Sequence, residues 1–464
     1  MDTRHTQPPW RGQLEALLAA LEHGLVERRL AVRLMVLVAL AGEHTLLIGP
    51  PGTAKSELAR RLHLAFADGR YFERLLTRFS VPEELFGPLS ISALEQDRYE
   101  RQTAGFLPEA SVAFIDEVFK ANSAILNALL TLLNEREFDN GAGRQRCPLI
   151  SAIGATNTVP EDEVAEAFFD RFLLRLPIAP VGTGGFRALL ELDGSPPPAS
   201  PPLDAGTLAA LTAAARQVAL TDAVAGVLGE LRHWLGEQGL YVSDRRWVKT
   251  LSLLKVAAAS EGRTALSLWD LWLLPWCAAP DEARQAAVGD WLVARLGVRE
   301  AISPARLTRV VEAFEAQAQV EVEANDLDYD ESGRLKFTED LAAAASDAKG
   351  ASQAMRMSYT RKRRYGSHHI GARLAQIDAL LERLADYGQE LAHHQAELSR
   401  YAAASLWLDP AFAERARANL QATGAALAAL RARALDARGR FEALPRLDGA
   451  PGETPAPVAH EPLL

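Results

Sequence analysis

An octapeptide near the N-terminus combines the residue types that bind phosphate. It reads Gly49-Pro-Pro-Gly-Thr-Ala-Lys-Ser56 and lies between an apolar run of strand length and a helical pattern. Glycines let backbone N–H groups wrap around phosphate oxygens, a lysine neutralises the outer phosphates, and a serine hydroxyl binds Mg²⁺. The start of the following helix adds favourable partial charge. The candidate binding residues are Gly49, Pro50, Pro51, Gly52, Thr53, Ala54, Lys55, Ser56 and Glu57, with Ser56 also a candidate metal ligand.

One position departs from the usual phosphate-binding pattern. Ala54 stands where glycine most often precedes the lysine. Its methyl group fits if the residue keeps a helical φ, so we expect reduced tolerance there rather than loss of binding. The alternative for the whole segment is a Gly/Pro-rich turn with a surface lysine, and the motifs further along the chain argue against it.

Polar residues end two later apolar runs. Asp116 and Glu117 follow Val112–Ile115, about 60 residues after the lysine, which is the arrangement of a Walker B motif. Asp116 would hold Mg²⁺ through water and Glu117 would polarise an attacking water. Asn157 ends the second run, and its amide would orient that water or sense the γ-phosphate. Taken alone, each pattern is also a common strand end, so the order of the three motifs carries the interpretation.

Alternating strands and helices must position these residues. Strand-length apolar runs cover Thr45–Ile48, Tyr71–Leu76, Val112–Ile115, Leu149–Ala155 and Phe172–Leu176, and helical patterns cover 14–41, Ser56–Ala67 and Ala121–Glu135. This alternation predicts an α/β core over residues 1–182, with a parallel sheet flanked by helices. The Pro/Gly-rich stretch 183–204 predicts an exposed linker, because proline cannot continue a helix.

The rest of the chain is rich in Ala and Leu and predicts helices. Residues 205–300 are expected to form a helical lid with core candidates Trp234, Trp247, Trp269, Trp272 and Trp276. Leucines at 3–4 spacing predict an antiparallel three-helix coiled-coil domain over 301–445, whose last helix begins at Pro410. Strand-like alternation over Val320–Phe337 marks a short insertion around 320–365. The Pro-rich tail 446–464 is expected to be disordered.

Composition bounds the class of protein. The 464 residues include 50 Lys+Arg and 60 Asp+Glu, and a net charge of −10 argues against a dedicated duplex-DNA coat protein. A hydrophobic fraction of 48% excludes wholesale disorder. Cys147 and Cys277 have no metal-site or disulfide spacing, which favours a reducing cytosol. No signal peptide is visible and no apolar window nears the roughly 18 residues of a membrane span, so a cytoplasmic protein is expected.

The basic run Arg356–Arg364, followed by Tyr365, is the strongest cluster of positive charge. Its charge and aromatic content fit an anionic-partner or nucleic-acid patch. Such runs are more often solvated linkers, and its position before the coiled coil fits that.

The motifs GPPGTAKS, FIDE and GATN, in this order, are similar to those of AAA+ ATPases of the MoxR family, and more narrowly of its RavA-like branch. The resemblance is carried by ERRLAVRLMVLVALAGEHTLLIGPPGTAKS, TRFSVPEELFGPLSISALEQDRYERQTAGFLPEA, FIDEVFKANSAILNALLTLLNEREF and YVSDRRW. It is dense over residues 20–180, sparser over 205–300, and extends weakly to SLWLDP. That family also has alanine before the P-loop lysine, so Ala54 fits it.

The resemblance implies further site residues. Phe169-Asp-Arg171-Phe matches the segment that supplies an arginine finger, so Arg171 would reach the γ-phosphate of a neighbouring subunit. The alternative to an arginine finger is an ordinary ion pair of Asp and Arg on the protein surface. Ser243-Asp-Arg245 matches the sensor-2 motif, with Asp244 in place of the usual proline, and the adjacent Arg246 leaves open which arginine contacts nucleotide. Residues 23–27 lie where the family's N-terminal segment flanks the adenine.

The resemblance also implies partners and an architecture. It implies a Mg²⁺-dependent ATPase that binds ATP between the subunits of a hexamer and acts with a partner that bears a von Willebrand factor A domain. The work done would be remodelling of a protein client or insertion of a metal cofactor. Segments 85–106 and 138–144, the second with an Asn-Gly turn, would form hairpins that face the ring's channel or one of its faces.

Two alternatives stay open. One is a DNA-translocating motor, since related AAA+ proteins include helicases, although the acidic charge and the lack of a DNA-binding module weigh against it. The other is a nucleotide-gated adaptor in which the coiled coil binds a client and hydrolysis resets the complex. The insertion around 320–365 is shorter and more polar than the β-rich module of the RavA-like branch, which puts a partner that binds there in doubt.

Overall fold

The computed structural model describes residues 8–67, 69–141, 143–157, 163–327, 360–447 and 451–462. The chain divides into two compact units. The first contains residues 1–296 and 400–414, and the second contains residues 297–399 and 415–464.

A parallel sheet forms the centre of the first unit's α/β part. Its strands are β1 (Thr45–Ile48), β2 (Tyr71–Leu75), β3 (Val112–Asp116), β6 (Ser151–Thr156) and β7 (Leu174–Pro177), in the order β2-β3-β6-β1-β7. The residues of β3 and β6 are buried almost throughout, as expected for strands covered on both faces. The predicted α/β fold class is confirmed, and each strand lies within two residues of its predicted position.

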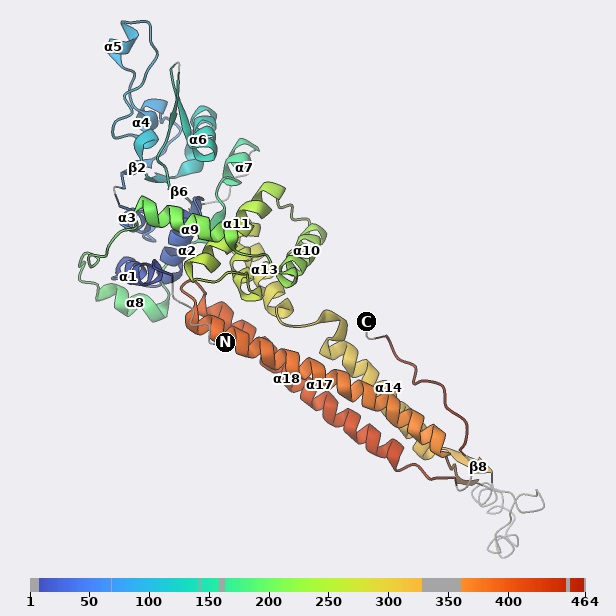
Figure 1. Ribbon diagram of the computed structural model, residues 1–464. Coiled ribbons are helices and arrows are strands. Elements are labelled where there is room, and N and C mark those ends of the chain that lie inside the picture. Colours follow the sequence, from blue (N-terminus) through green and yellow to red (C-terminus); the bar gives the residue numbers. More distant parts are fainter. Residues whose placement is uncertain are drawn as a thin grey trace, which may run out of the picture. The chain divides into compact units, whose positions relative to one another are not determined.

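Helices flank this sheet (Figure 1). They include α1 (Arg11–Glu22), α2 (Arg29–Leu40), α3 (Lys55–His63), α6 (Ser123–Glu135) and α7 (Glu163–Phe169). The expectation of one continuous helix over 14–41 is wrong. The chain breaks between α1 and α2, where Gly24 and Glu27 have φ of 67° and 55°, left-handed values that end a right-handed helix.

Two segments extend from the sheet layer (Figure 1). The first carries α4 (Pro82–Phe86) and α5 (Ile91–Leu94), and a single antiparallel bridge joins Leu89 to Arg101. The expected hairpin over 85–106 is therefore a loop with a short helix at its tip. The second is a true hairpin of β4 (Glu137–Asn140) and β5 (Gly143–Arg146), as its Asn-Gly turn predicts.

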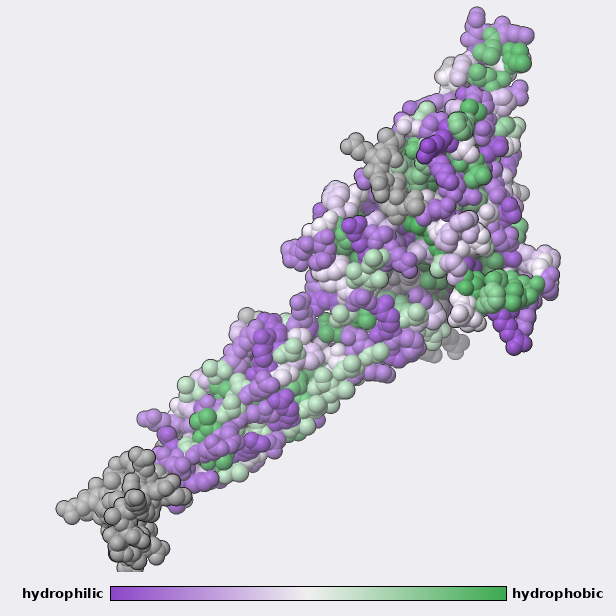
Figure 2. All heavy atoms as spheres, turned by 180° about the vertical axis from the view of Figure 1, so that it is seen from behind, coloured by the Kyte–Doolittle hydropathy of each residue, from purple (hydrophilic) through white to green (hydrophobic). Residues whose placement is uncertain are grey.

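The expected linker begins with a helix. Residues Thr183–Leu190 form α8, and the extended Pro-rich segment starts only after it. No residue of α8 is buried, and the side chains of Phe186 and Leu190 are 54% and 70% exposed. Figure 2 shows apolar side chains at the surface of this part of the first unit. The extent 183–204 given to the linker is therefore too long, because the prolines exclude a helix only from Pro196 onwards.

The helical lid follows. It contains α9 (Ala205–Gln217), α10 (Asp222–Glu237), α11 (Asp244–Ser260), α12 (Leu274–Ala278) and α13 (Glu282–Arg295). Side chains cap the starts of α9, α10, α11 and α13; at α11, for example, the Ser243 hydroxyl accepts from the Arg246 N–H. Of the predicted core tryptophans, Trp269 and Trp272 are fully buried, whereas the other three are half-buried.

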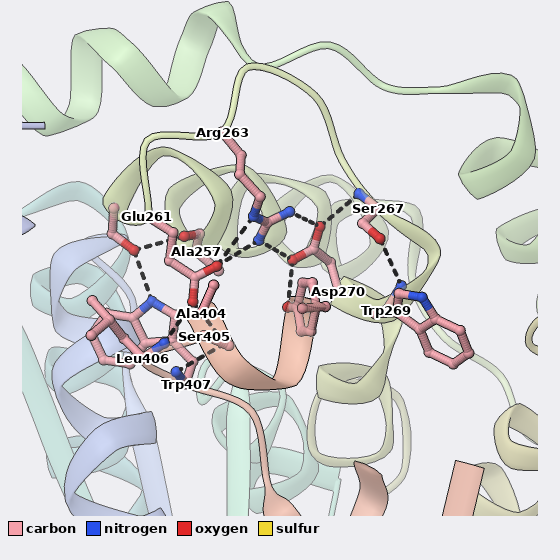
Figure 3. A network of polar contacts seen from close by, with 12 residues as sticks. Ala257, Glu261, Arg263, Ser267, Trp269, Asp270, Ala404, Ser405, Leu406 and Trp407 are labelled. Atoms are coloured by element: carbon pink, nitrogen blue, oxygen red, sulfur yellow. Dashed lines mark hydrogen bonds and ion pairs between the residues drawn. The ribbon is translucent and has the colours of Figure 1, made fainter. Parts of the chain in front are cut away.

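A turn from the far end of the sequence completes the first unit (Figure 3). The Tyr401 hydroxyl donates to Asp270 Oδ1 at 2.8 Å, and the Trp407 indole N–H donates to the Ser260 hydroxyl at 2.7 Å. Arg263 pairs with both oxygens of Asp270, whose side chain is fully buried. Burial raises the pKa of Glu261 in the same network. These contacts hold residues 400–414 against the lid.

Three helices make up most of the second unit: α14 (Pro304–Glu323), α17 (Ser367–Ala404) and α18 (Pro410–Glu442) (Figure 1). The last begins at the predicted proline, and the expected three-helix arrangement is confirmed. The strand-like reading of Val320 and Val322 is wrong, since α14 continues to Glu323. A short antiparallel pair, β8 (Asn325–Leu327) and β9 (Thr360–Lys362), follows.

Two sequence expectations fall partly outside the described residues. Leu335 and Phe337 of the strand-like pattern, and 356–359 of the basic run, lie in the range 328–359. The tail is described over 451–462, where Arg373 donates to the Ala456 carbonyl at 2.7 Å and Val458 is buried. The expectation of disorder is therefore wrong for this stretch. Among the described helices, none has the length and hydropathy to cross a membrane.

Candidate nucleotide-binding and hydrolysis site

The phosphate-binding segment connects β1 to α3. Gly49 packs so closely that a Cβ would lie 2.2 Å from the Ile178 carbonyl oxygen, and Gly52 has φ of 80°. The Lys55 ammonium donates to the carbonyls of Gly49 and Pro50 at 2.7 and 2.8 Å. The loop therefore curls around its own lysine. Burial lowers the pKa of Lys55, and the nearby charges of Asp116 and Glu117 oppose that shift.

Ala54 does not keep the helical backbone that the sequence interpretation required. Its φ is 67° and its ψ is 25°, in the left-handed region. An L-residue with a Cβ pays a conformational cost in this region that glycine does not. The alanine is thus accommodated by strain rather than by a helical φ, and this corrects the expectation.

The candidate catalytic residues lie at the same edge of the sheet. Gly49, Glu117 and Asn157 each follow a parallel strand, and β6 lies between β3 and β1. The carboxyl ends of parallel strands meet at one edge. The Asn157 amide donates to Glu117 Oε1 at 2.8 Å, and Asp116 Oδ1 accepts from the Glu117 N–H at 2.9 Å.

Glu117 has two features that the sequence did not indicate. Its backbone is left-handed, with φ of 51°, and the Lys120 ammonium lies 3.3 Å from its Oε2. Asn157 and Lys120 thus each contact one oxygen of the carboxylate. Lys120 comes three residues after Glu117, a spacing that is visible in the sequence but common on helices.

The residues present fit a nucleotide with Mg²⁺. Across the described residues no group of three His, Cys, Asp or Glu side chains could hold a metal by itself. Mg²⁺ bound with a nucleotide typically uses one or two protein oxygens and the phosphates, rather than a complete protein cage. Ser56 on the first turn of α3 and Asp116 at the end of β3 supply such oxygens beside Lys55.

Arg28 is a further residue at this site that the sequence analysis missed. It is 7% exposed, and it donates to the carbonyl of Thr53 in the P-loop at 3.2 Å and to that of Ala179 after β7 at 2.7 Å. The neighbouring Glu27 accepts from the Gly182 N–H at 2.8 Å. Residues 27–28 therefore connect the P-loop to the chain that leaves the sheet. An Arg at the start of an apolar helix carries no signal for this role.

Arg171 lies at the opposite edge of the sheet. It precedes β7, whose first residue, Leu174, pairs with Thr45 at the start of β1. A strand advances about 3.3 Å per residue, so the four residues of β1 separate this edge from the P-loop by roughly 10 Å or more. Arg171 is therefore not brought together with Lys55, Asp116, Glu117 or Asn157 of its own chain. Burial, and then the nearby charge of Arg245, lower the pKa of Arg171.

The two sensor-2 candidates have different environments. Arg245 is exposed and donates to the side chain of Asn134 at 2.8 Å. Arg246 is 3% exposed and donates to Asp170 and to backbone carbonyls of its own chain. Arg245 is therefore the one of the pair that can contact a nucleotide, and it lies near Arg171 rather than near the P-loop.

These features define a P-loop protein of the AAA+ class. They are a parallel sheet with a P-loop after β1, acidic residues after β3, an asparagine after β6, which lies between those two strands, and a helical lid. The family model described as "MoxR domain in the MoxR-vWA-beta-propeller ternary systems" matches residues 12–195, and an AAA lid domain model matches 223–292. The chain belongs to the MoxR family of AAA+ ATPases.

The chain is also similar to individual proteins. Two uncharacterized proteins of Methanocaldococcus jannaschii are 39% identical over 264 residues (56% of this chain, 69% of theirs) and 37% identical over 279 residues (59% and 74%). Protein MoxR of Paracoccus denitrificans is 27% identical over 175 residues, 36% of this chain and 51% of its own. A solved structure from Cytophaga hutchinsonii has 16% identity and a TM-score of 0.48, and the match covers 60% of this chain and 90% of that one.

Proposed function

We propose that this chain is a Mg²⁺-dependent ATPase that works as a homo-oligomeric ring and remodels a protein client or assists the insertion of a metal cofactor. The observation that carries the proposal is the convergence of Lys55, Asp116, Glu117 and Asn157 at one edge of the sheet. Placement in the RavA-like branch stays a prediction.

We propose the following roles for the residues of this site. Backbone N–H groups of the P-loop, the start of α3 and Lys55 bind the phosphates. Ser56 and Asp116 would hold Mg²⁺, which would neutralise charge on the phosphates. Glu117 takes a proton from the attacking water once the water replaces one of its two present contacts, and Asn157 orients that water.

Arg171 and Arg245 act on a neighbouring subunit in this proposal. Arg171 lies at the amino edge of the sheet and Arg245 lies near it, so both are remote from the P-loop of their own chain. A site that needs a guanidinium at the γ-phosphate is then completed by the next copy in a head-to-tail ring. A hexamer is the ring size that the family resemblance implies.

The proposed partner is a protein with a von Willebrand factor A domain. The matching family model is described from systems in which a MoxR domain occurs with such a domain and a β-propeller. The loop that carries α5 and the β4–β5 hairpin are the proposed channel elements. Ile91 at the start of α5 is 74% exposed, which suits contact with an extended client.

The test is affinity capture with Glu117→Gln in the presence of ATP. This variant keeps the binding residues but lacks the base, so it should retain ATP and hold its partner or client, which is then identified. Lys55→Ala is the matched control, since it should neither bind ATP nor capture the same protein. Recovery of nucleic acid without any protein would refute the proposed function and favour a DNA motor.

A further inference from the structure

A buried arginine of the lid donates hydrogen bonds to the backbone on both sides of Arg171. Arg246, in the first turn of α11, donates to the Asp170 carbonyl at 3.1 Å and to the carbonyls of Phe172 and Leu173 at 2.7 Å each. It also donates to Asp170 Oδ1 at 3.0 Å. Arg171 is the residue enclosed by these acceptors.

Every N–H of this guanidinium has a partner. The fifth donor, Nε–H, bonds to the Cys277 carbonyl. A guanidinium carries five N–H groups in a fixed planar fork, so this one has none left for a nucleotide. Arg246 is also only 3% exposed. Although Arg246 lies in the sensor-2 motif, it is therefore not accessible to a nucleotide in this conformation.

Other lid residues support the same segment. The Ser243 hydroxyl, which caps α11, lies 3.5 Å from Asp170 Oδ2, and Gln285 of α13 donates to the Arg175 carbonyl at 2.8 Å. Arg175 lies 3.5 Å from Asp170 Oδ1, and its guanidinium carbon is 3.9 Å from the centre of the Phe169 ring. Residues 169–175 are thus bound to the lid from both ends.

The Arg171 side chain itself is held much less. Its Nε is buried without a hydrogen-bond partner in the described structure. The backbone therefore sets the position from which this side chain extends, and Arg246 binds that backbone on both sides. A rotation of α11 relative to β7 must either carry residues 170–173 with it or break the bonds to Arg246.

We infer that Arg246 is a positioning residue: it fixes Arg171 for the nucleotide of the neighbouring subunit and so couples the position of the lid to hydrolysis next door. The inference rests on the proposed function, in which Arg171 acts in trans and Glu117 in cis. It assigns to the lid of one subunit a role in the active site of the next.

Mixed-subunit assays separate the two sides of the interface. Arg246→Gln alone should retain ATP affinity and KM but lose about a hundredfold in kcat, the size of loss expected for a misplaced catalytic group. Mixed with Glu117→Gln, whose finger is intact, it should recover activity at about a quarter of the interfaces of a random ring. Mixed with Arg171→Ala it should stay inactive, since both chains then lack a working finger.

The controls make each outcome decisive. Arg284→Gln removes an exposed arginine of α13 and should behave as wild type. Arg246→Lys, which keeps the charge but loses most of the fork, goes through the same mixtures in case Arg246→Gln does not fold. The inference would be overturned if Arg171→Ala restored the activity of the Arg246 variants. It would also be overturned if Glu117→Gln failed to restore the activity of either Arg246 variant. If Glu117→Gln and Arg171→Ala fail to restore each other, the trans finger itself is wrong, and the inference falls with it.

Discussion

Two residues of the candidate site hold backbone conformations that side chains disfavour. Ala54 and Glu117 have φ of 67° and 51°; Ala54 precedes Lys55 of the P-loop, and Glu117 follows β3. Such residues cost of order 1–3 kcal/mol each and persist where the surrounding structure determines them. The P-loop and the end of β3 therefore store strain where rigid placement of donors and of a carboxylate matters.

Replacing Ala54 by glycine should stabilise the nucleotide-free protein. Removing the Cβ relieves the left-handed strain, and this outweighs the extra freedom that glycine has in the unfolded chain. We expect the free energy of unfolding to rise by about 0.5–1 kcal/mol. Denaturant titrations of both proteins measure it. An unchanged or lower value would mean that the backbone at Ala54 is not strained.

At this scale the motif residues could be predicted and their conformations could not. Lys55, Asp116 and Asn157 belong to short local patterns whose order along the chain is informative. The left-handed φ of Ala54 and the five bonds of Arg246 depend on partners far away in sequence, such as Cys277. No local pattern encodes those contacts.

One buried ion pair, between Arg263 and Asp270, lies at the centre of the network in Figure 3. Asp270 is fully buried and receives Arg263, the Ser267 N–H and the Tyr401 hydroxyl. It thereby joins the start of the 3₁₀ segment Leu268–Leu273 to the turn of residues 400–414. Asp270 therefore fixes the relative positions of its three partners. A buried ion pair can do this even where hydrophobic residues of the same volume would make the protein equally stable.

Asp270→Ala should destabilise the first unit by about 3 kcal/mol, the low end for breaking a buried pair, because a quarter of the Arg263 side chain stays in water. Tryptophan fluorescence during denaturation measures this, since Trp269 and Trp407 lie in the network. Glu230→Ala is the matched control: it breaks the exposed pair with Arg295 and should cost no more than about 1 kcal/mol. Equal losses would mean that Asp270 is not central.

Helices and strands could be predicted where a single sequence pattern marks them. A four-residue apolar run ended by glycine gives β1, and Pro410 gives the start of α18. Helix α8 was missed because the prolines that follow it dominate the composition, and it buries no side chain that would mark it. Val320 was misread because two alternating β-branched residues at the end of α14 imitate a strand.

At the scale of the molecule, the sheet separates two sets of candidate functional residues. The P-loop, Asp116, Glu117 and Asn157 lie at its carboxyl edge, whereas Arg171 lies at its amino edge. The strand order that brings Asn157 between β1 and β3 follows from tertiary packing. The sequence motifs therefore suggested the residues of the site, and the family resemblance suggested that Arg171 acts on a neighbouring subunit, but neither indicated the distance between Arg171 and the P-loop of its own chain.

Acid should destabilise the protein through His44. The imidazole is buried, its Nδ1 accepts from the Ala152 N–H, and its Nε2 donates to the Leu133 carbonyl. Burial, followed by the charge of Arg136, holds the pKa of His44 well below 6.5, with Lys249 adding to the shift and the Leu133 bond opposing it. The folded protein therefore keeps His44 neutral, whereas the unfolded chain takes up its proton near pH 6.5.

The stability that this provides is complete above about pH 6.5 and falls by about 1.4 kcal/mol per pH unit below it, until the folded pKa is reached. His44→Asn removes the titration and should flatten this part of the profile. Denaturant titrations of both proteins between pH 5 and 7.5 give the comparison, in which other groups cancel. Identical slopes would show that His44 is protonated in the folded state.

The most direct test of the proposed ATPase is to measure ATP binding and hydrolysis together in Arg171→Ala. We expect normal ATP affinity, because the carboxyl edge is untouched, and hydrolysis reduced by about three to five orders of magnitude, the contribution of an arginine finger. Normal turnover by this variant would contradict an active site completed by the neighbouring subunit.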